Sequence, residues 1–193
     1  DVTLVATNPT TWFERHPLYI TTTDNRIVEI QAEIATRARI NEVPMRTVVR
    51  DADGTVVYTS TKNVPINRKW RTMELKTDSF VVENPRLWSC ETPHLYTASV
   101  AILDAEGAVM DSVAHTFGIR TIEFSPEFGM KLNGEKVILK GIANHHTLGA
   151  LGAAAYPRAI EKRLQLLKEY GFNHIRTSHN PYSKSFLQLC DEY

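Results

Sequence analysis

Apolar and polar residues alternate along two stretches within the first 120 residues of the chain. Every second residue from Val28 to Ile34 is apolar, and the pattern recurs from Tyr96 to Ile102. A period of two residues is typical of a strand that is buried on one face. Further strands are predicted at 46–50, 55–59, 70–76 and 109–117, and no helical period separates them.

Two short polar segments separate neighbouring strands. Residues 51–54 read Asp-Ala-Asp-Gly and residues 104–107 read Asp-Ala-Glu-Gly, and both suit the tight turn of a β-hairpin. About seven short strands at such regular spacing are typical of an antiparallel β-sandwich of immunoglobulin or fibronectin type. We therefore predict an immunoglobulin-like sandwich domain over residues 1–120.

The pattern changes near residue 121. Asn133-Gly134 predicts another hairpin, and an almost continuous apolar strand is predicted from Val137 to Ala143. A helix is predicted from Pro157 with one apolar stripe, and Gly171 suits the left-handed residue that ends a helix. The stripe consists of Ile160, Leu164 and Leu167.

A second strand and helix follow in the same order. The strand is predicted at 172–177, Pro181 breaks it, and Ser183 caps a helix that points Leu187 and Cys190 inward. Strand–helix–strand–helix order favours parallel strands with crossover helices. Residues 121–193 are therefore predicted to be the truncated N-terminal part of a (β/α)8 barrel, which needs eight such units and about 250 residues. The whole chain is predicted to be mainly β.

Composition limits the possible partners. The chain has 22 basic and 22 acidic residues, a balance that argues against a nucleic-acid or anionic-membrane partner. No apolar run approaches the roughly 20 residues that span a bilayer. The first residues carry no leader pattern, which suggests a processed chain or a part of a longer one. The only two cysteines, Cys90 and Cys190, are interpreted as free thiols, so cytoplasmic and exported (periplasmic) locations both stay open.

Polar side chains follow both predicted barrel strands. Asn144-His145-His146 follows the first strand, and the second ends in Arg176-Thr177-Ser178-His179-Asn180-Pro181. Reactive residues of such barrels lie at the carboxyl ends of the strands, so these groups are expected to converge on one rim. Their hydrogen-bonding groups suit a polyhydroxylated ligand, and an arginine could orient a carboxylate.

Several segments together resemble glycoside hydrolase family 2, the group of β-galactosidases, β-glucuronidases and β-mannosidases. The resemblance covers residues 117–193, through FGIRTIEF, GMKLNGEKVILKGIANHH and the RTSHNP segment at 176–181. The LGALGAA segment after the paired histidines is closer to the β-galactosidase-like members. LVATNPT and LWSCETPHLY, earlier in the chain, resemble the sandwich domain that precedes the barrel in this family.

The resemblance implies a sugar-binding role for four residues. His145 and His179 match histidines that help bind the sugar, Arg176 matches an arginine on the floor of the site, and Asn180 follows the motif histidine. Close relatives usually place Asp after the paired histidines, whereas this chain has Thr147, which removes a carboxylate from the rim.

The resemblance also implies a retaining mechanism, which needs two carboxyl groups about 5–5.5 Å apart. In this family both come from later barrel strands, so we expect a fragment of a glycoside hydrolase that is inactive by itself. The alternative is a non-catalytic carbohydrate-binding or structural sandwich module. An exposed barrel edge in so short a segment also predicts self-association, or disorder towards the C-terminus.

Other interpretations of the same residues are less demanding. His145, His146 and His179 could bind Zn²⁺, but the resemblance favours sugar binding, so no metal and no cofactor are assigned. Arg176 could bond backbone carbonyls inside the barrel. The tryptophans are interpreted as packing residues of the sandwich, in preference to a stacking platform for sugars: Trp12, Trp70 and Trp88.

Overall fold

The computed structural model describes residues 4–66, 72–154 and 156–193. The chain forms two compact units, one from residues 1–86 and 95–119 and the other from 87–94 and 120–193. Residues 87–94, which were expected inside the sandwich domain, thus belong to the second unit. Trp70 and the residue after it, the first two of the strand predicted at 70–76, lie outside the described residues.

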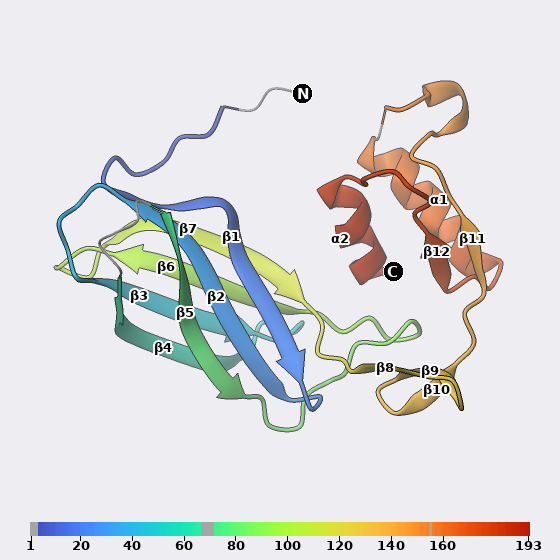
Figure 1. The fold of residues 1–193 in the computed structure, drawn as a ribbon, viewed down its shortest axis with the longest axis horizontal. Helices are drawn as coiled ribbons and strands as arrows, with labels where there is room; N and C mark the ends of the chain where they lie inside the picture. The colour runs from blue at the N-terminus through green and yellow to red at the C-terminus, as the bar shows by residue number, and fades with distance from the viewer. Residues whose placement is uncertain (1–3, 67–71, 155) are drawn as a thin grey trace. The chain divides into compact units, whose positions relative to one another are not determined.

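Seven strands build the first unit from the residues that the structure describes (Figure 1). One sheet has the order β1-β2-β5 and the other the order β4-β3-β6-β7, and every pairing is antiparallel. This arrangement is the predicted β-sandwich. The strands are β1 (Thr11–Thr23), β2 (Ile27–Thr36), β3 (Glu42–Arg50), β4 (Val56–Pro65), β5 (Thr72–Val81), β6 (Tyr96–Leu103) and β7 (Val109–Phe117).

Alternating apolar side chains from both sheets form the core of this unit. The alternating apolar residues of β2 and β6 are all buried, as predicted, and Met45 and Val49 of β3 join them. Because successive residues of a strand face opposite sides, a one-residue shift in register would expose each of these rows.

The two predicted hairpin turns of the sandwich are confirmed, and each begins with an aspartate. Asp51 Oδ1 accepts hydrogen bonds from the backbone N–H groups of Asp53 and Thr55. Asp104 Oδ1 accepts in the same way from Glu106 and Ala108. The carboxylate therefore satisfies the backbone donors that each tight turn leaves unpaired.

A buried carboxylate links the two sheets of the sandwich at one edge. Asp78 of β5 accepts hydrogen bonds from Thr47 of β3 and from Tyr58 and Ser60 of β4, both at 2.8 Å. Lys62 Nζ lies 2.8 Å from the same carboxylate. A bulge in the β2–β5 pairing at this point leaves consecutive residues, Thr77 and Asp78, both buried.

The second unit contains a small antiparallel sheet and a parallel pair of strands with two helices (Figure 1). The strands of the small sheet are β8 (Ile122–Ser125), β9 (Gly129–Leu132) and β10 (Glu135–Val137). The parallel pair is β11 (Gly141–Ala143) and β12 (His174–Arg176), with a 3-10 turn η1 (Gly149–Leu151) and the helices α1 (Pro157–Glu169) and α2 (Lys184–Glu192). This order is that of the first two units of the predicted barrel.

Local signals placed three boundaries of these elements correctly. Asn133 and Gly134 adopt φ of 54° and 85° in the turn between β9 and β10, as a tight hairpin requires. Pro157 occupies the first turn of α1, and Ser183 Oγ accepts a hydrogen bond from Phe186 N at the start of α2.

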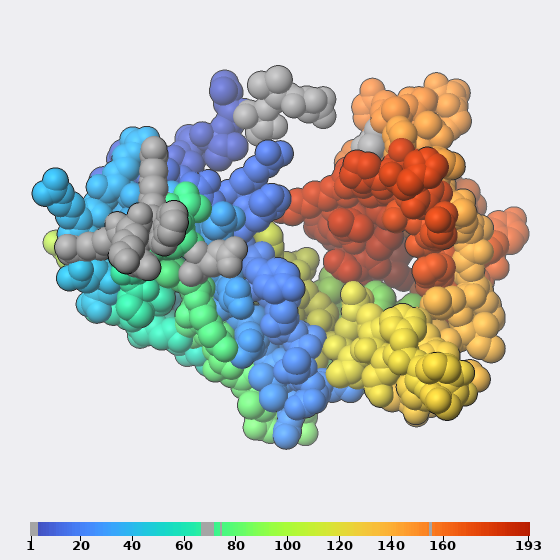
Figure 2. All heavy atoms as spheres, viewed as in Figure 1, coloured from blue at the N-terminus to red at the C-terminus, as the bar shows by residue number. Residues whose placement is uncertain are grey.

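The helices pack on the parallel strands through one apolar cluster. Ile160 and Leu164 of α1 are buried with Phe186 of α2, and Ile175 of β12 packs against them. Figure 2 shows the residues near the C-terminus, coloured red, gathered in one packed mass. Of the residues predicted to face inward from α2, Cys190 does so, but Leu187 is 55% exposed and Phe186 takes its place.

The strand predicted at 137–143 is wrong in its middle. Residues 138–140 belong to no strand, and the predicted stretch is divided between β10 and β11. The side chain of Asn173 explains the break, because its Oδ1 accepts from Lys140 N and its Nδ2 donates to Ile138 O. These backbone groups are thereby taken from strand pairing, and the strand predicted at 172–177 shortens to 174–176.

Candidate functional site

The parallel pairing of β11 with β12 brings two chain segments to one rim. Ala143 pairs with Arg176, the last residues of the two strands, so the segments that follow leave the sheet side by side. Ile175 turns to the helix cluster, and its neighbours His174 and Arg176 point to the opposite face because side chains alternate along a strand. That face is the one directed toward the interior of a barrel.

Three of the four predicted site residues meet at this rim. His145 Nδ1 and Asn180 Oδ1 are 3.1 Å apart, within hydrogen-bonding distance. The imidazole rings of His145 and His179 lie edge to face, with centroids 5.0 Å apart. All three residues are exposed or half-buried, so polar groups from both segments are accessible to a ligand.

Arg176 is the fourth predicted residue, and its place is set by the strand. Its side chain is exposed, while its carbonyl oxygen accepts a hydrogen bond from Asn144 N at 2.9 Å. Because Arg176 is the last residue of β12, it lies at the same end of the sheet as the two histidines. Among the described residues, its guanidinium contacts neither imidazole.

Backbone strain marks the segment that carries His179. Ser178 adopts a φ of 49°, a left-handed conformation that is uncommon for residues other than glycine. Such conformations persist where the surrounding structure imposes them, and they cluster at functional sites.

The predicted rim depends on residues that the sequence analysis missed. Arg163 of α1 donates to Asn144 Oδ1 at 3.0 Å and to the carbonyl of Thr147 at 2.8 Å. Tyr182 donates its hydroxyl proton to the carbonyl of Asn144 at 2.6 Å. Burial raises the pKa of the Tyr182 phenol, with Arg163 acting in the opposite direction, so the hydroxyl stays protonated as a donor. A helix surface position and a lone tyrosine carry no sequence signal for this role.

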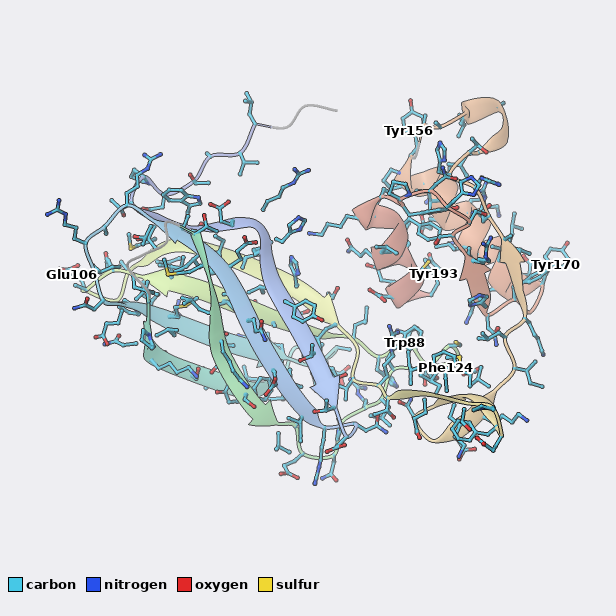
Figure 3. The ribbon with its side chains drawn as sticks, viewed as in Figure 1. Trp88, Glu106, Phe124, Tyr156, Tyr170 and Tyr193 are labelled. Atoms are coloured by element: carbon cyan, nitrogen blue, oxygen red, sulfur yellow. The ribbon has the colours of Figure 1, made fainter. Side chains whose placement is uncertain are left out.

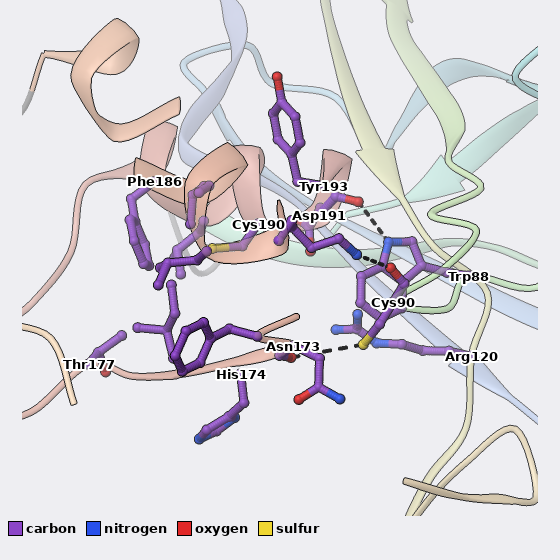
Figure 4. A pocket seen from close by; sticks show the side chains of 16 residues that line it. Trp88, Cys90, Arg120, Asn173, His174, Thr177, Phe186, Cys190, Asp191 and Tyr193 are labelled. Atoms are coloured by element: carbon purple, nitrogen blue, oxygen red, sulfur yellow. Dashed lines mark hydrogen bonds between the residues drawn. The ribbon is translucent and has the colours of Figure 1, made fainter. Parts of the chain in front are cut away.

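A separate pocket of about 300 Å³ lies elsewhere in the second unit (Figure 4). Trp88 closes one side, where its indole Nε1 donates to the carbonyl of Asp191 at 2.7 Å and Arg120 stacks on its ring. None of the four predicted sugar-binding residues lines this pocket. Trp88 is 9% exposed and packs here, not in the sandwich where it was expected, and its buried ring is no stacking platform.

One carboxyl group of this pocket has a perturbed pKa. Burial raises the pKa of Asp191, and the nearby guanidinium of Arg120 counteracts part of that effect. A half-buried carboxyl with a raised pKa in a pocket is a candidate acid catalyst. Asp191 is the single carboxylate among the described residues that line this pocket, whereas glycoside hydrolysis uses a pair.

Neither a metal cluster nor a membrane span is found in the described part of the chain. No group of three or more His, Cys, Asp or Glu side chains there is placed to hold a metal ion. None of the described helices is long and apolar enough to cross a bilayer. Both cysteines are free, and burial raises the pKa of the Cys190 thiol to about 11.

The fold and the rim define a class of protein: an immunoglobulin-like sandwich joined to the start of a (β/α)8 barrel with polar groups at its strand ends. Comparison with known families agrees with this class. Residues 7–120 match the family model of glycosyl hydrolases family 2, and residues 127–193 match the TIM-barrel domain of that family. The chain therefore belongs to glycosyl hydrolase family 2.

Similar proteins come from several bacteria. A β-galactosidase of Bacteroides ovatus, BoGH2A, is 44% identical over 115 residues, which is 60% of this chain and 13% of that protein. A β-galactosidase of Halalkalibacterium halodurans is 31% identical over 167 residues, which is 86% of this chain and 16% of that protein. The chain thus spans less than a fifth of the length of these relatives.

Solved structures of other proteins are similar to this chain. A family 2 glycosyl hydrolase of Bacteroides cellulosilyticus superposes with a TM-score of 0.83 at 34% identity, over 93% of this chain and 25% of the other. A β-glucuronidase of Bacteroides uniformis superposes with a TM-score of 0.83 at 26% identity, over 95% of this chain and 23% of the other.

Proposed function

We propose that this chain is part of a retaining glycoside hydrolase of the β-galactosidase type. In this proposal His145, Arg176, His179 and Asn180 bind the sugar, and carboxylates outside residues 1–193 cleave the bond. The contact between His145 and Asn180 at 3.1 Å is the observation that carries the proposal, because it joins the two strand-end segments into one polar rim.

The chemistry of the rim supports a sugar as the ligand. Imidazole and amide groups donate and accept hydrogen bonds in fixed directions, as recognition of neighbouring hydroxyl groups requires. The names of the relatives favour a galactoside, and the glucuronidase neighbour raises a glucuronide as the competitor. The guanidinium of Arg176 can donate two hydrogen bonds to a carboxylate, so Arg176 would contribute most to binding if the sugar were a uronic acid.

Binding tests separate these sugars. We expect galactose to bind this chain with a Kd of order 1 mM, corresponding to about −4 kcal/mol, as followed by NMR titration. His179→Ala should weaken binding roughly fivefold, the effect of one lost hydrogen bond of about 1 kcal/mol. His16→Ala is the matched control, because His16 is an exposed histidine of the sandwich. Tighter binding of glucuronate that is abolished by Arg176→Ala would reassign the substrate class.

The division of labour has its own test. None of the four proposed sugar-binding residues is a carboxylate, and Asp191 is the single carboxylate side chain among the described residues that line the separate pocket, so neither place offers the pair that the reaction uses. We therefore expect no hydrolysis of nitrophenyl galactoside by this chain above the rate in buffer. Turnover that disappears in the His179→Ala variant would contradict the proposal. Sugar binding without turnover by a longer protein that carries this chain would favour a non-catalytic carbohydrate-binding module.

A further inference from the structure

The peptide that carries His145 and His146 has no regular structure of its own. It runs from the end of β11 at Ala143 to the 3-10 turn at Gly149, and both histidines are exposed. Strand pairing cannot hold these residues, and their exposed rings gain little from packing. A polar rim of fixed geometry therefore needs anchors on either side of the two histidines.

The anchor before the histidines is Asn144, which is held at three separate atoms. Its backbone N–H donates to Arg176 O at 2.9 Å, and its carbonyl accepts from Tyr182 Oη at 2.6 Å. Its side-chain Oδ1 accepts from Arg163 Nη1 at 3.0 Å. The partners come from β12, the segment before α2, and α1, so three elements converge on this one residue.

The anchor after the histidines is the carbonyl of Thr147, and the same arginine holds it. Arg163 Nη2 donates to this oxygen at 2.8 Å. One guanidinium thus spans both ends of the dipeptide His145-His146. A planar fork with fixed directions can hold two acceptors in this way, whereas the single ammonium of lysine cannot reproduce the geometry.

The base of the fork is itself fixed. Arg163 precedes Leu164 in α1, and Leu164 is buried with Ile160 and Phe186 in the cluster that packs on β12. The helix therefore carries its guanidinium to a constant position relative to the strand ends. Tyr182 is fixed in a similar way, because its ring packs on Phe186 with centroids 4.3 Å apart.

We propose that Arg163 and Tyr182 are positioning residues for the sugar-binding rim. They clamp residues 144–147 so that the ring of His145 stays within reach of Asn180 and against His179. The value of the clamp for recognition rests on the proposed function, but its effect on the two histidines is measurable without any sugar.

The experiment uses this chain labelled with ¹⁵N and ¹³C, and it compares wild type with Arg163→Ala, Arg163→Lys and Tyr182→Phe. The ring resonances of His145 and His179 report the rim, and amide exchange at Asn144 and Leu148 reports the peptide. Loss of two charge-assisted hydrogen bonds in Arg163→Ala should accelerate exchange at Asn144 at least roughly tenfold and shift both imidazoles. Arg163→Lys should restore only part of the effect, and Tyr182→Phe should give a smaller change of the same kind.

Arg158→Ala is the matched control, because Arg158 lies on the same helix and its side chain is 93% exposed in a pair with Glu161. This variant should leave the histidine resonances unchanged. Unchanged resonances of the Ile160–Leu164–Phe186 cluster show that a variant has folded. If Arg163→Ala does not fold, Arg163→Lys and Tyr182→Phe decide the question.

Two outcomes keep this proposal apart from the proposed function. Altered histidine resonances in a chain whose wild type binds neither galactose nor glucuronate would support the clamp and contradict the sugar site. Sugar binding by the wild type, together with unchanged histidine resonances and unchanged exchange in both Arg163 variants and Tyr182→Phe, would overturn the clamp alone.

Discussion

At the scale of single residues, Asp78 illustrates how a buried charge can be stabilised by a full set of partners. Its side chain is 1% exposed, and transfer of a carboxylate from water to such a site is costly unless it is paired and hydrogen-bonded. Three hydroxyl groups and Lys62 meet that requirement. Because they come from the opposite sheet, the carboxylate joins the two sheets of the sandwich at this edge.

We expect Asp78→Asn to lower the free energy of unfolding by about 2 kcal/mol, the worth of hydrogen bonds to a charged group. The lost attraction to Lys62 adds little, since that ammonium group is 44% exposed and can be hydrated. Urea denaturation followed by tryptophan fluorescence measures the change. Asp53→Asn removes an exposed pair with Arg86 and should change stability by less than about 1 kcal/mol. Equal effects of the two variants would contradict the role of Asp78.

The same carboxylate makes the sandwich sensitive to acid. Burial acts to raise the pKa of Asp78, but the hydrogen bonds from Lys62, Thr47, Ser60 and Tyr58 outweigh it and leave the pKa below its ordinary value. A lowered pKa in the folded state means that the stabilisation is complete above the unfolded pKa of about 3.9. It is lost as the pH falls from there through the folded pKa. Urea denaturation at pH 7 and at pH 3 measures the effect. The free energy of unfolding should fall more between these two pH values for wild type than for Asp78→Asn.

Gly141 is a second residue whose identity is fixed by its neighbour. A Cβ at this position would lie 2.6 Å from both Cδ2 and the carbonyl oxygen of His174. Because a backbone atom cannot yield as a side chain does, Gly141→Ala should separate β11 from β12 at a cost of about 1–3 kcal/mol. Loss of amide protection at Asn173 and Asn144 would measure this. Ala143→Ser, at the other end of the same strand, should leave both amides protected.

At the scale of elements, alternation and turn chemistry predicted the sandwich because they are local. The rows of β2 and β6 and the turns at Asp51 and Asp104 depend on neighbours in sequence. The break between β10 and β11 does not, because it comes from the Asn173 side chain, 33 residues beyond Lys140. The clamp of Arg163 on Asn144 is equally non-local. The positions of the rim histidines were predictable from the strand order, but the groups that hold them were not.

The end of α1 offers an element-scale test of a predicted signal. Gly171 adopts a φ of 80°, its N–H donates to Lys168 O, and Phe172 N donates to Leu167 O. This pair of bonds is a Schellman motif. A Cβ at Gly171 would meet open space, so Gly171→Ala isolates the backbone cost, which should be about 1–2 kcal/mol. Thermal unfolding by circular dichroism measures it, and Lys162→Ala on the exposed side of α1 should change stability by less than about 0.5 kcal/mol.

At the scale of the whole molecule, the chain passes between its two units more than once. Residues 87–94 lie between β5 and β6 in the sequence but belong to the second unit, and the chain then continues in the sandwich with β6. There the carbonyl of Trp88 accepts from Asn133 Nδ2 at 3.0 Å, and the carbonyl of Cys90 accepts from Lys168. The second unit therefore includes a segment from the sandwich half of the sequence, and the boundary between the two family matches near residue 120 does not coincide with the division into units.

The parallel pair β11–β12 gives the last prediction. In the described residues each strand pairs only with the other, so each has one edge of unpaired backbone groups. Unpaired strand edges can bind strands of other chains. Apolar surface is also exposed on Tyr170 and Ile138, both more than two-thirds exposed. Figure 3 shows Tyr170 pointing away from the unit. A second copy presents the same edge, so pairing between copies satisfies both. We expect the sedimentation coefficient of this chain to rise with concentration. Asn144 N donates to Arg176 O, so the N–H of the preceding residue, Ala143, points to the open edge of β11. Ala143→Pro should therefore alter the concentration dependence, whereas Val109→Pro at a sandwich strand end should not. A monomer at all concentrations, with amides of 172–193 protected throughout, would show that the edges are already covered within one copy.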